Sequence, residues 1–283
     1  MDYNFDLATV WALVIAFAVF VYVVMDGFDL GIGILFPTLR VGEERDTAMN
    51  SVAPVWDGNE TWLILGGGGL MAAFPLAYAI ILPAVYVPVI AMLLALIFRG
   101  VAFEFRWRDP RHRAFWDLAF AGGSIIAAVS QGVILGALLQ GITVQGRQYG
   151  GGWWDWLTPF SLLTGVSVLV GYALLGATWL IMRTEGTLQL HATRYARWLG
   201  AGTVGFIVAV SAATPFLSSA YFQRWFAWPH VLIVAQVPLM VAIGTYLFFR
   251  SLAQGYERAP FLIALALFLL CFIGLGIRRC GRI

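Results

Sequence analysis

Long apolar segments separated by short polar ones run along the whole chain. They predict membrane-spanning helices at residues 7–36, 56–74, 77–99, 115–139, 157–182, 199–220, 230–250 and 260–277. Each segment has about 20 residues or more, which is the length that a helix needs to cross the hydrocarbon core of a bilayer. The pattern therefore predicts an all-α polytopic membrane protein with about eight transmembrane helices, forming a single integral membrane domain over residues 1–283.

The composition agrees with this interpretation. The chain is 61% hydrophobic and 11% charged, whereas soluble domains are about 45–50% apolar and about 25% charged. We therefore expect a lipid bilayer around the protein and no nucleic acid as a partner. The segment before the first span, Met1 to Asp6, is acidic, whereas a secretory signal peptide begins with basic residues. We expect the first apolar segment to be retained as a span.

The basic residues predict the orientation of the chain. All seventeen are arginine, and arginines gather in the loops on the cytoplasmic side of membrane proteins. If the N-terminus lies outside, the inner loops and helix ends hold twelve of them: Arg40, Arg45, Arg99, Arg106, Arg108, Arg111, Arg113, Arg183, Arg194, Arg197, Arg250 and Arg258. The outer loops then hold Arg147 and Arg224. The sequence therefore predicts an N-terminus on the outer face of the membrane.

A segment near the end of the first apolar run, Asp26-Gly27-Phe28-Asp29-Leu30-Gly31, carries two carboxylates. An aspartate in the middle of a membrane span costs roughly 2.5–3.5 kcal/mol on an insertion scale, so we expect Asp26 and Asp29 to have partners or access to water. Gly27 and Gly31 form a small-residue pair, which allows another helix to approach closely.

A second segment, Trp56-Asp57-Gly58-Asn59-Glu60-Thr61-Trp62, opens the second predicted span. Asp57 and Glu60 are three residues apart, the same spacing as in the first segment. Arg99 and Glu104 follow the third predicted span on the same side of the membrane. We therefore expect a cluster of four or five carboxylates with one nearby arginine, close to the inner surface.

Two hypotheses explain such a cluster. Crowded carboxylates in a medium of low dielectric constant cannot all remain ionised, so the cluster could take up protons from the inside, with Asp26 near the entrance and Asp57 further along. Alternatively, these side chains are charges at helix ends that form ion pairs, with Arg40, Arg45 or Arg99 as the partners. The residues alone leave both hypotheses open.

Histidine is scarce in this chain. A carrier of several haems needs axial ligands, usually histidine or methionine, on facing helices. Of the three histidines, His112 and His191 fall in arginine-rich loops, and His230 alone lies near a span. We interpret His230 as a residue at the membrane interface, and we expect no haem and no metal site in this chain.

Several motifs, taken in order, resemble those of one known family. They are the Asp26–Gly31 and Trp56–Trp62 segments, Asn50-Ser51 with Pro54, Phe98-Arg99 with Phe103 to Arg106, Pro159 with Gly165, and Arg183 to Gly186. With these motifs, which cover nearly the whole chain, the sequence resembles subunit II of the cytochrome bd-type quinol oxidases.

The resemblance implies a respiratory heterodimer that oxidises quinol and reduces oxygen to water. Haems b and d and the quinol-oxidising site would lie in the partner, subunit I. This chain would bind no haem itself, with a quinone as a candidate ligand and a small accessory membrane subunit as a candidate further partner. It would fold as two four-helix bundles with a peripheral helix, stabilise subunit I, and supply part of a proton path from the cytoplasm. Its location would be the bacterial cytoplasmic (inner) membrane, with the N-terminus in the periplasm.

The resemblance also implies roles for individual residues. Asp26 and Asp57 match the acidic residues of the family's proton path, and Asp29 and Arg99 match polar positions beside them. Glu60 and Glu104 are further candidates for supporting polar groups. Trp62 matches a tryptophan associated with an oxygen route. Family members continue with another membrane segment after the eighth helix, so we expect this chain to be truncated at its C-terminus.

Two other functions use the same residues. A proton-coupled secondary transporter would use the same carboxylates, and it should show internal repeats or broken helices around a site in the middle of the membrane. A purely structural partner would tolerate the substitution Asp57→Asn without loss of oxygen consumption or proton uptake.

Overall fold

The computed structural model describes residues 6–217 and 230–279, and within them the side chains except at 230–234 and 275–279. The α-helices are α1 (Leu7–Leu35), α2 (Glu43–Val52), α3 (Trp56–Ala73), α4 (Pro75–Ala84), α5 (Tyr86–Arg108), α6 (Arg113–Gln140), α7 (Pro159–Arg183), α8 (Gly186–Ala213), α10 (His230–Ala253) and α11 (Ala259–Arg279). Short 3-10 turns η1 (Phe36–Thr38), η2 (Pro110–His112) and η3 (Thr214–Phe216) extend three of the helix ends.

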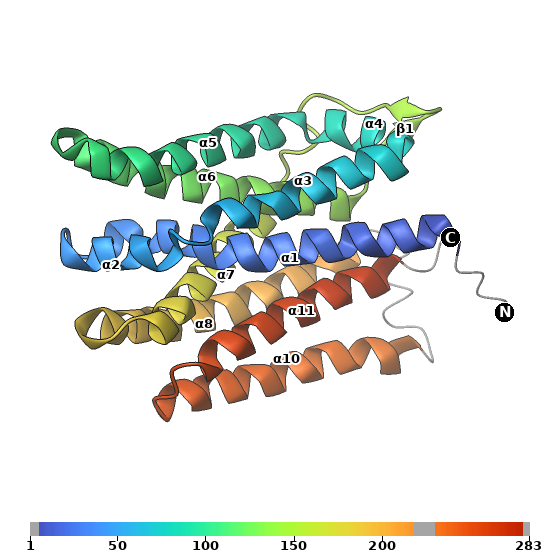
Figure 1. Cartoon of the computed structure of the whole chain (residues 1–283). Coiled ribbons are helices and arrows are strands. Elements are labelled where there is room, and N and C mark those ends of the chain that lie inside the picture. Colours follow the sequence, from blue (N-terminus) through green and yellow to red (C-terminus); the bar gives the residue numbers. More distant parts are fainter. Residues whose placement is uncertain (1–5, 218–229, 280–283) are drawn as a thin grey trace.

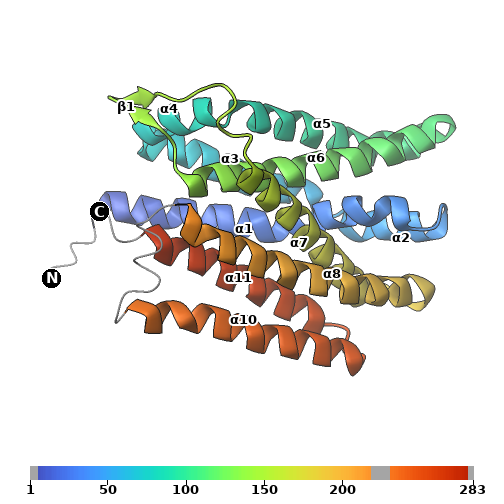
Figure 2. The same cartoon turned by 180° about the vertical axis from the view of Figure 1, so that it is seen from behind.

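The long helices run roughly parallel to one axis (Figures 1 and 2). Helices α3, α5 and α6 lie on one side of α1, and α8, α10 and α11 lie on the other. One end of the molecule carries α2 together with the α5–α6 and α7–α8 turns, and we call it the α2 end. The opposite end carries a small hairpin of β1 (Val144–Gln145) and β2 (Gln148–Tyr149), turned at Gly146 with a positive φ of 62°. We call it the hairpin end.

The prediction of an all-helical membrane protein is confirmed. Six helices of the described chain are long and apolar enough to cross a membrane, and two shorter apolar helices, Pro75–Ala84 and Ala259–Gly274, accompany them. The predicted spans 7–36, 115–139, 157–182, 230–250 and 260–277 agree with α1, α6, α7, α10 and α11 to within a few residues.

The predicted span at 77–99 is wrong. The chain forms α4 up to Ala84 and then starts α5 at Tyr86, which continues to Arg108. Residues on both sides of this turn are apolar, so the hydrophobic pattern does not mark it. Pro88 is a better marker of this turn. It lies in the first turn of α5, where a backbone N–H has no intrahelical partner and proline is tolerated.

Two further differences concern polar helical segments. Helix α8 starts at Gly186, thirteen residues before the predicted span at 199–220, and the predicted end of that span lies outside the described residues. Helix α2 was not predicted. Both segments are helical but polar, so a search for apolar runs passes over them.

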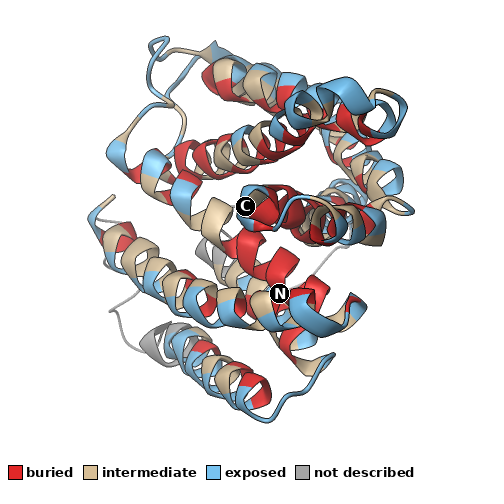
Figure 3. Ribbon diagram, turned by 90° about the vertical axis from the view of Figure 1, so that its left-hand side faces the viewer, coloured by how far each residue is buried: buried red, intermediate tan, exposed pale blue. Residues whose placement is uncertain are grey.

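The closest packing in the core joins α1 to α7. A Cβ atom on Gly31 would lie 1.9 Å from the carbonyl oxygen of Tyr172, and one on Gly176 would lie 2.4 Å from the carbonyl carbon of Gly31. The two backbones therefore touch, as expected for the Gly27–Gly31 pair. Beside this contact Phe28 stacks on Trp179, with ring centroids 4.2 Å apart. Figure 3 shows buried residues gathered where the central helices meet.

Candidate functional site

Helix α1 runs through the Asp26–Gly31 segment without interruption, and all six residues are buried. The segment remains helical despite its glycines because α7 packs directly on it at Gly31. On the neighbouring face a Cβ on Gly33 would clash with Ser124 of α6. Asp26 and Asp29 are consequently held between helices rather than at the surface of the protein, and both are fully buried.

Asp29 forms an ion pair inside the protein. Its Oδ1 lies 2.5 Å from Nη2 of Arg99, and both side chains are fully buried. Its Oδ2 accepts a hydrogen bond of 3.3 Å from the amide of Asn59, which also donates to the carbonyl oxygen of Met25. This pairing agrees with the expectation that intramembrane carboxylates have partners.

Arg99 is enclosed by α5 and α6. Helix α6 comes close because Gly123 has no side chain: a Cβ there would lie 3.0 Å from the Cβ of Arg99. The guanidinium carbon lies 5.2 Å from the ring centroid of Phe103 and 5.7 Å from that of Phe120. Nη1 lies 3.9 Å from Oε1 of Glu60, whose side chain is 29% exposed. Glu60 therefore connects the buried arginine to the edge of the cluster.

Asp26 completes the cluster and has a different environment. Both of its carboxylate oxygens are buried and lack a well-formed hydrogen bond to any residue that the structure describes. The ionisable groups that act on it are Tyr22, Asp29, Glu60 and Arg99. Three carboxylates thus share one guanidinium, so they cannot all remain ionised without a large electrostatic cost. Asp26 differs from Asp29 and Glu60 in that it forms no ion pair with any residue of the described chain.

Asp57 lies outside this buried group. It is exposed in the first turn of α3, where a negative charge interacts favourably with the helix dipole. It is close enough to Glu60 for the two charges to interact. This arrangement is the reverse of the expected order, since Asp57 is at the surface of the chain and Asp26 is deep inside.

Glu104 and Trp62 do not join the cluster. Glu104 is 60% exposed and forms a surface ion pair of 3.3 Å with Arg108 on the same helix, so the structure does not bring it to the cluster as expected. Trp62 is half-buried on α3 and meets the ring of Phe17 edge to face, with centroids 6.0 Å apart.

A second network of charges at the α2 end was missed in the sequence. Asp117 of α6 accepts hydrogen bonds from Arg106 at 2.5 Å and from Arg45 at 2.8 Å. Asp46 of α2 pairs with Arg106 at 2.9 Å and also with Arg113. Asp117 itself lay within a predicted span, and an isolated carboxylate there could have signalled a buried partner.

The second network holds the Asp46 carboxyl in its ionised form. Partial burial acts to raise the pKa of Asp46, but hydrogen bonds from Arg113 and Arg106 outweigh it and lower that pKa below its ordinary value. Asp46 lies on α2, outside the spans. The network therefore attaches α2 to α5 and α6.

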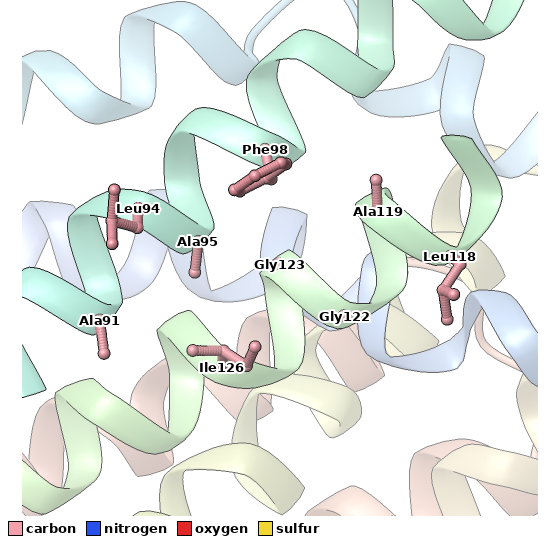
Figure 4. Close-up of a pocket in the computed structure, with 9 residues that line it drawn as sticks. All are labelled: Ala91, Leu94, Ala95, Phe98, Leu118, Ala119, Gly122, Gly123 and Ile126. Atoms are coloured by element: carbon pink, nitrogen blue, oxygen red, sulfur yellow. The ribbon is translucent and has the colours of Figure 1, made fainter. Parts of the chain in front are cut away.

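An apolar groove of about 400 Å³ runs between α5 and α6 (Figure 4). Its lining includes Ala91, Phe98, Gly122 and Ile126, and no residue of the lining is charged. The groove therefore offers surface for apolar chains and is separate from the carboxylate cluster.

The histidines have carboxylate neighbours. Nδ1 of His112 lies 2.8 Å from Asp109, and Nδ1 of His191 lies 3.2 Å from Glu44, both at the α2 end. His230 begins α10, but its side chain lies outside the described residues. Among the described residues, no group of three or more His, Cys, Asp or Glu side chains is arranged to hold a metal ion.

Comparison with known proteins gives consistent matches. The family model "Cytochrome bd terminal oxidase subunit II" matches residues 7–281. The "Cytochrome bd-I ubiquinol oxidase subunit 2" of Escherichia coli strain K12 is 40% identical over 206 residues, which are 70% of this chain and 54% of that protein. The "Cytochrome bd ubiquinol oxidase subunit 2" of Bacillus subtilis strain 168 is 31% identical over 223 residues, which are 77% of this chain and 66% of that protein. The chain thus spans about half the length of the Escherichia coli relative.

The fold also matches a solved structure. A chain of the bd oxidase from Geobacillus thermodenitrificans superposes with a TM-score of 0.73, covering 96% of this chain and 84% of that chain. The two sequences are 16% identical, so this likeness concerns the arrangement of the helices.

Proposed function

This chain belongs to the cytochrome bd terminal oxidase subunit II family, and we propose that it serves as the second subunit of a quinol oxidase. In this proposal it pairs with subunit I in a bacterial cytoplasmic membrane, and the complex oxidises quinol and reduces oxygen to water. Matched relatives named as subunit 2 of ubiquinol oxidases support the proposal.

The proposal assigns haems b and d to subunit I. In this chain, His112 and His191 lie beside carboxylates at the α2 end, away from the buried faces where axial ligands would be needed. The chain would contribute helices that stabilise subunit I. We propose that these form two four-helix bundles, one of α1, α3–α4, α5 and α6 and the other of α7, α8, α10 and α11.

We propose that the carboxylate cluster forms part of a proton path that starts at the α2 end. Exposed Asp57 would collect the proton, half-buried Glu60 would pass it inward, and Asp26 would receive it. Arg99 remains charged and does not transfer protons. Its role is to neutralise Asp29 and to hold the cluster together. The observation that carries this proposal is a fully buried Asp26 without an ion-pair partner among the described residues, next to a cluster that reaches the surface through Glu60.

The proposal requires the α2 end to face the cytoplasm, with the N-terminus in the periplasm. The arginine distribution supports this orientation, because Arg45, Arg106 and Arg113 join the network of charges at the α2 end. Arg147 lies in the hairpin turn at the opposite end. Protons for oxygen reduction would then enter from the cytoplasm.

The experiment measures oxygen consumption and proton uptake by the complex that contains this chain, at matched amounts of complex. We expect Asp26→Asn to lower both by about 10²-fold, because a positioned proton-transfer group contributes roughly that much. Asp57→Asn and Glu60→Gln should lower both to a smaller extent, since water can replace groups near the surface.

Glu104→Gln provides the matched control for Glu60→Gln. Both substitutions remove a carboxylate charge near the α2 end, but Glu104 forms only an exposed ion pair. We expect its oxygen consumption to remain within about twofold of the wild type. Normal turnover and normal proton uptake in Asp26→Asn would refute the proton path and favour a purely structural subunit.

The transporter alternative has less support. The chain does contain a broken helix, at Phe74 and Pro75 between α3 and α4. However, this break follows the C-terminal end of α3 at Ala73, whereas Asp57 and Glu60 lie at the N-terminal end of the same helix. A transporter would need the break and the charged groups at one site.

A further inference from the structure

A chain of hydrogen bonds crosses three helices beside Asp26. The hydroxyl group of Tyr172 on α7 donates to Oε1 of Gln131 on α6 at 2.6 Å. The amide nitrogen of Gln131 donates in turn to the hydroxyl oxygen of Tyr22 on α1 at 2.8 Å. Tyr22 and Tyr172 are both buried. Polar groups are costly to bury in a protein interior, so the arrangement calls for an explanation beyond packing.

The direction of these hydrogen bonds leaves one donor unused. Tyr172 donates to Gln131, and Gln131 donates to Tyr22. The oxygen of Tyr22 therefore accepts a hydrogen bond, while its own hydrogen is donated in none of the hydrogen bonds between described residues. A hydroxyl group can donate one hydrogen bond and can rotate to find its acceptor.

The unused acceptor is one helical turn away. Asp26 follows Tyr22 by four residues on α1, so the two side chains share a face of the helix. Both carboxylate oxygens of Asp26 are buried without a well-formed hydrogen bond to the described residues. Tyr22 is near enough to interact with this carboxylate. An available donor and a buried acceptor thus face each other.

We propose that Tyr172, Gln131 and Tyr22 are positioning residues, which direct the Tyr22 hydroxyl hydrogen at Asp26 and so set the pH range in which Asp26 accepts a proton. This inference rests on the proposed proton path. It adds a mechanism by which α6 and α7 control a carboxylate of α1.

The hydrogen-bond chain is a support and does not conduct protons. A carboxamide would have to form an unstable tautomer to relay a proton, and Tyr172 ends the chain as a donor to Gln131. Tyr172 is also fixed in place. A Cβ on Gly27 would lie 3.0 Å from its ring, and Phe268 stacks on the ring with centroids 6.1 Å apart. The rigid end of the chain orients the amide, and the amide orients Tyr22.

Other ionisable groups also act on Asp26: Asp29 from α1, Glu60 from α3, and Arg99 from α5. None of them hydrogen bonds to Tyr22, Gln131 or Tyr172 in the described chain. Substitutions in the hydrogen-bond chain therefore leave this set of charges unchanged. A shift in the pH profile of such a variant reports the hydrogen bond to Asp26.

The test compares pH profiles of oxygen consumption by the assembled complex. A hydrogen bond that favours the ionised carboxylate is lost in Tyr22→Phe, so the protonated form persists to higher pH. We expect the inflection of the profile to move upward by about one pH unit. Gln131→Leu should produce a shift in the same direction, and Tyr172→Phe a smaller one.

The chain offers matched controls. Gln140 lies on the same helix as Gln131, and it hydrogen bonds to Thr158 at 2.8 Å and to the carbonyl oxygen of Gly136 at 3.2 Å. Tyr195 donates a hydrogen bond to the carbonyl oxygen of Thr38. Gln140→Leu and Tyr195→Phe therefore remove comparable hydrogen bonds away from Asp26. Both should keep the wild-type inflection.

The outcomes separate this inference from the proposed function. If Asp26→Asn slows turnover but Tyr22→Phe and Gln131→Leu keep the wild-type inflection, the positioning role is refuted and the proton path stands.

If Asp26→Asn has normal turnover, the proton path is refuted. The positioning role is then tested through the infrared C=O band of protonated Asp26, identified by its loss in Asp26→Asn. A pH titration of that band that is unchanged in Tyr22→Phe overturns the inference, and a shifted one supports it. Should Gln131→Leu fail to assemble, the two Tyr→Phe variants, which each lose one oxygen atom, carry the test.

Discussion

Arg99 of α5 lies 2.5 Å from Asp29 of α1, with both side chains fully buried. The ion pair joins residues 29 and 99, which are seventy positions apart in the sequence, and it fixes the position of the carboxylate cluster. Its contribution to stability can be measured by substitution of one or both partners.

We expect Arg99→Gln to be more harmful than the double variant Asp29→Asn/Arg99→Gln. Removal of one partner leaves an uncompensated buried charge, which costs about 3–5 kcal/mol, whereas removal of both avoids that cost. The measurement is thermal unfolding of the detergent-solubilised complex. Arg108→Gln is the control, because its exposed ion pair with Glu104 contributes about 1 kcal/mol or less. Equal melting temperatures of the single and the double variant would contradict this expectation.

Gly31→Ala should destabilise the protein strongly. The added methyl group would lie 1.9 Å from the carbonyl oxygen of Tyr172, which is backbone and cannot rotate away. Overpacking of this kind costs about 1–3 kcal/mol or more. The measurement is the yield and thermal stability of the assembled protein. Gly67→Ala on α3 serves as the control, since a Cβ there meets nothing within 4 Å in the described chain.

Low pH should weaken the attachment of α2 to α5 and α6. Because the folded state lowers the pKa of Asp46, its ionised form contributes stability that is present above its ordinary value near 4 and is lost as the pH falls through the lower folded-state value. We expect the protection factors of α2 amides, which are exchange rates corrected for the intrinsic effect of pH, to fall below about pH 4. In Asp46→Asn the protection should already be low at neutral pH and should lose this pH dependence. Protection factors in α2 that stay constant through this pH range in the wild type would rule out this role of Asp46.

Asp117→Asn should loosen α2 at neutral pH as well. The substitution removes the carboxylate that pairs with both Arg106 and Arg45, and it leaves the buried guanidinium of Arg106 with Asp46 alone. Loss of one member of a buried ion pair costs about 3–5 kcal/mol. Limited proteolysis between α1 and α3 detects the release. The control is Asp109→Asn, which removes an exposed carboxylate close by on the same side of the molecule.

The sequence was informative where a residue type is unusual in its surroundings. Two aspartates in a long apolar run and a pair of glycines four residues apart both departed from the pattern of a simple span. The expectation of partners for Asp29 and of close helix packing at Gly31 followed from these features, and the structure confirms both. The aspartates were predictable because an unpaired carboxylate inside a membrane is costly, and the glycines because small residues allow helices to approach closely.

Other features could not be derived from the sequence because they depend on which neighbours fold against a segment. Glu104 lies five residues after Arg99, so spacing placed it near the cluster, but the turn of α5 directs it to the surface. Asp57 and Asp26 both lie in glycine-containing motifs. Asp57 is nevertheless exposed at the start of α3, whereas α7 and α6 pack on α1 and Asp26 is buried. The residues on both sides of the turn at Val85 are apolar, so the pattern of hydrophobic residues could not predict the turn.

The contact between Gly31 and Gly176 also bears on motion. Two helices whose backbones touch have no intervening side chains that could change rotamer to let one helix slide, and packed interiors do not deform continuously. Asp26 and Asp29 therefore stand on an immobile scaffold. In the proposed proton path, the structural change needed to deliver a proton falls to Glu60 and Asp57 on the open side of α3, where side-chain rotation takes picoseconds to nanoseconds. In this picture, delivery of protons to Asp26 needs no helix movement, and its speed is set by how often an acidic side chain at the edge of the cluster turns inward.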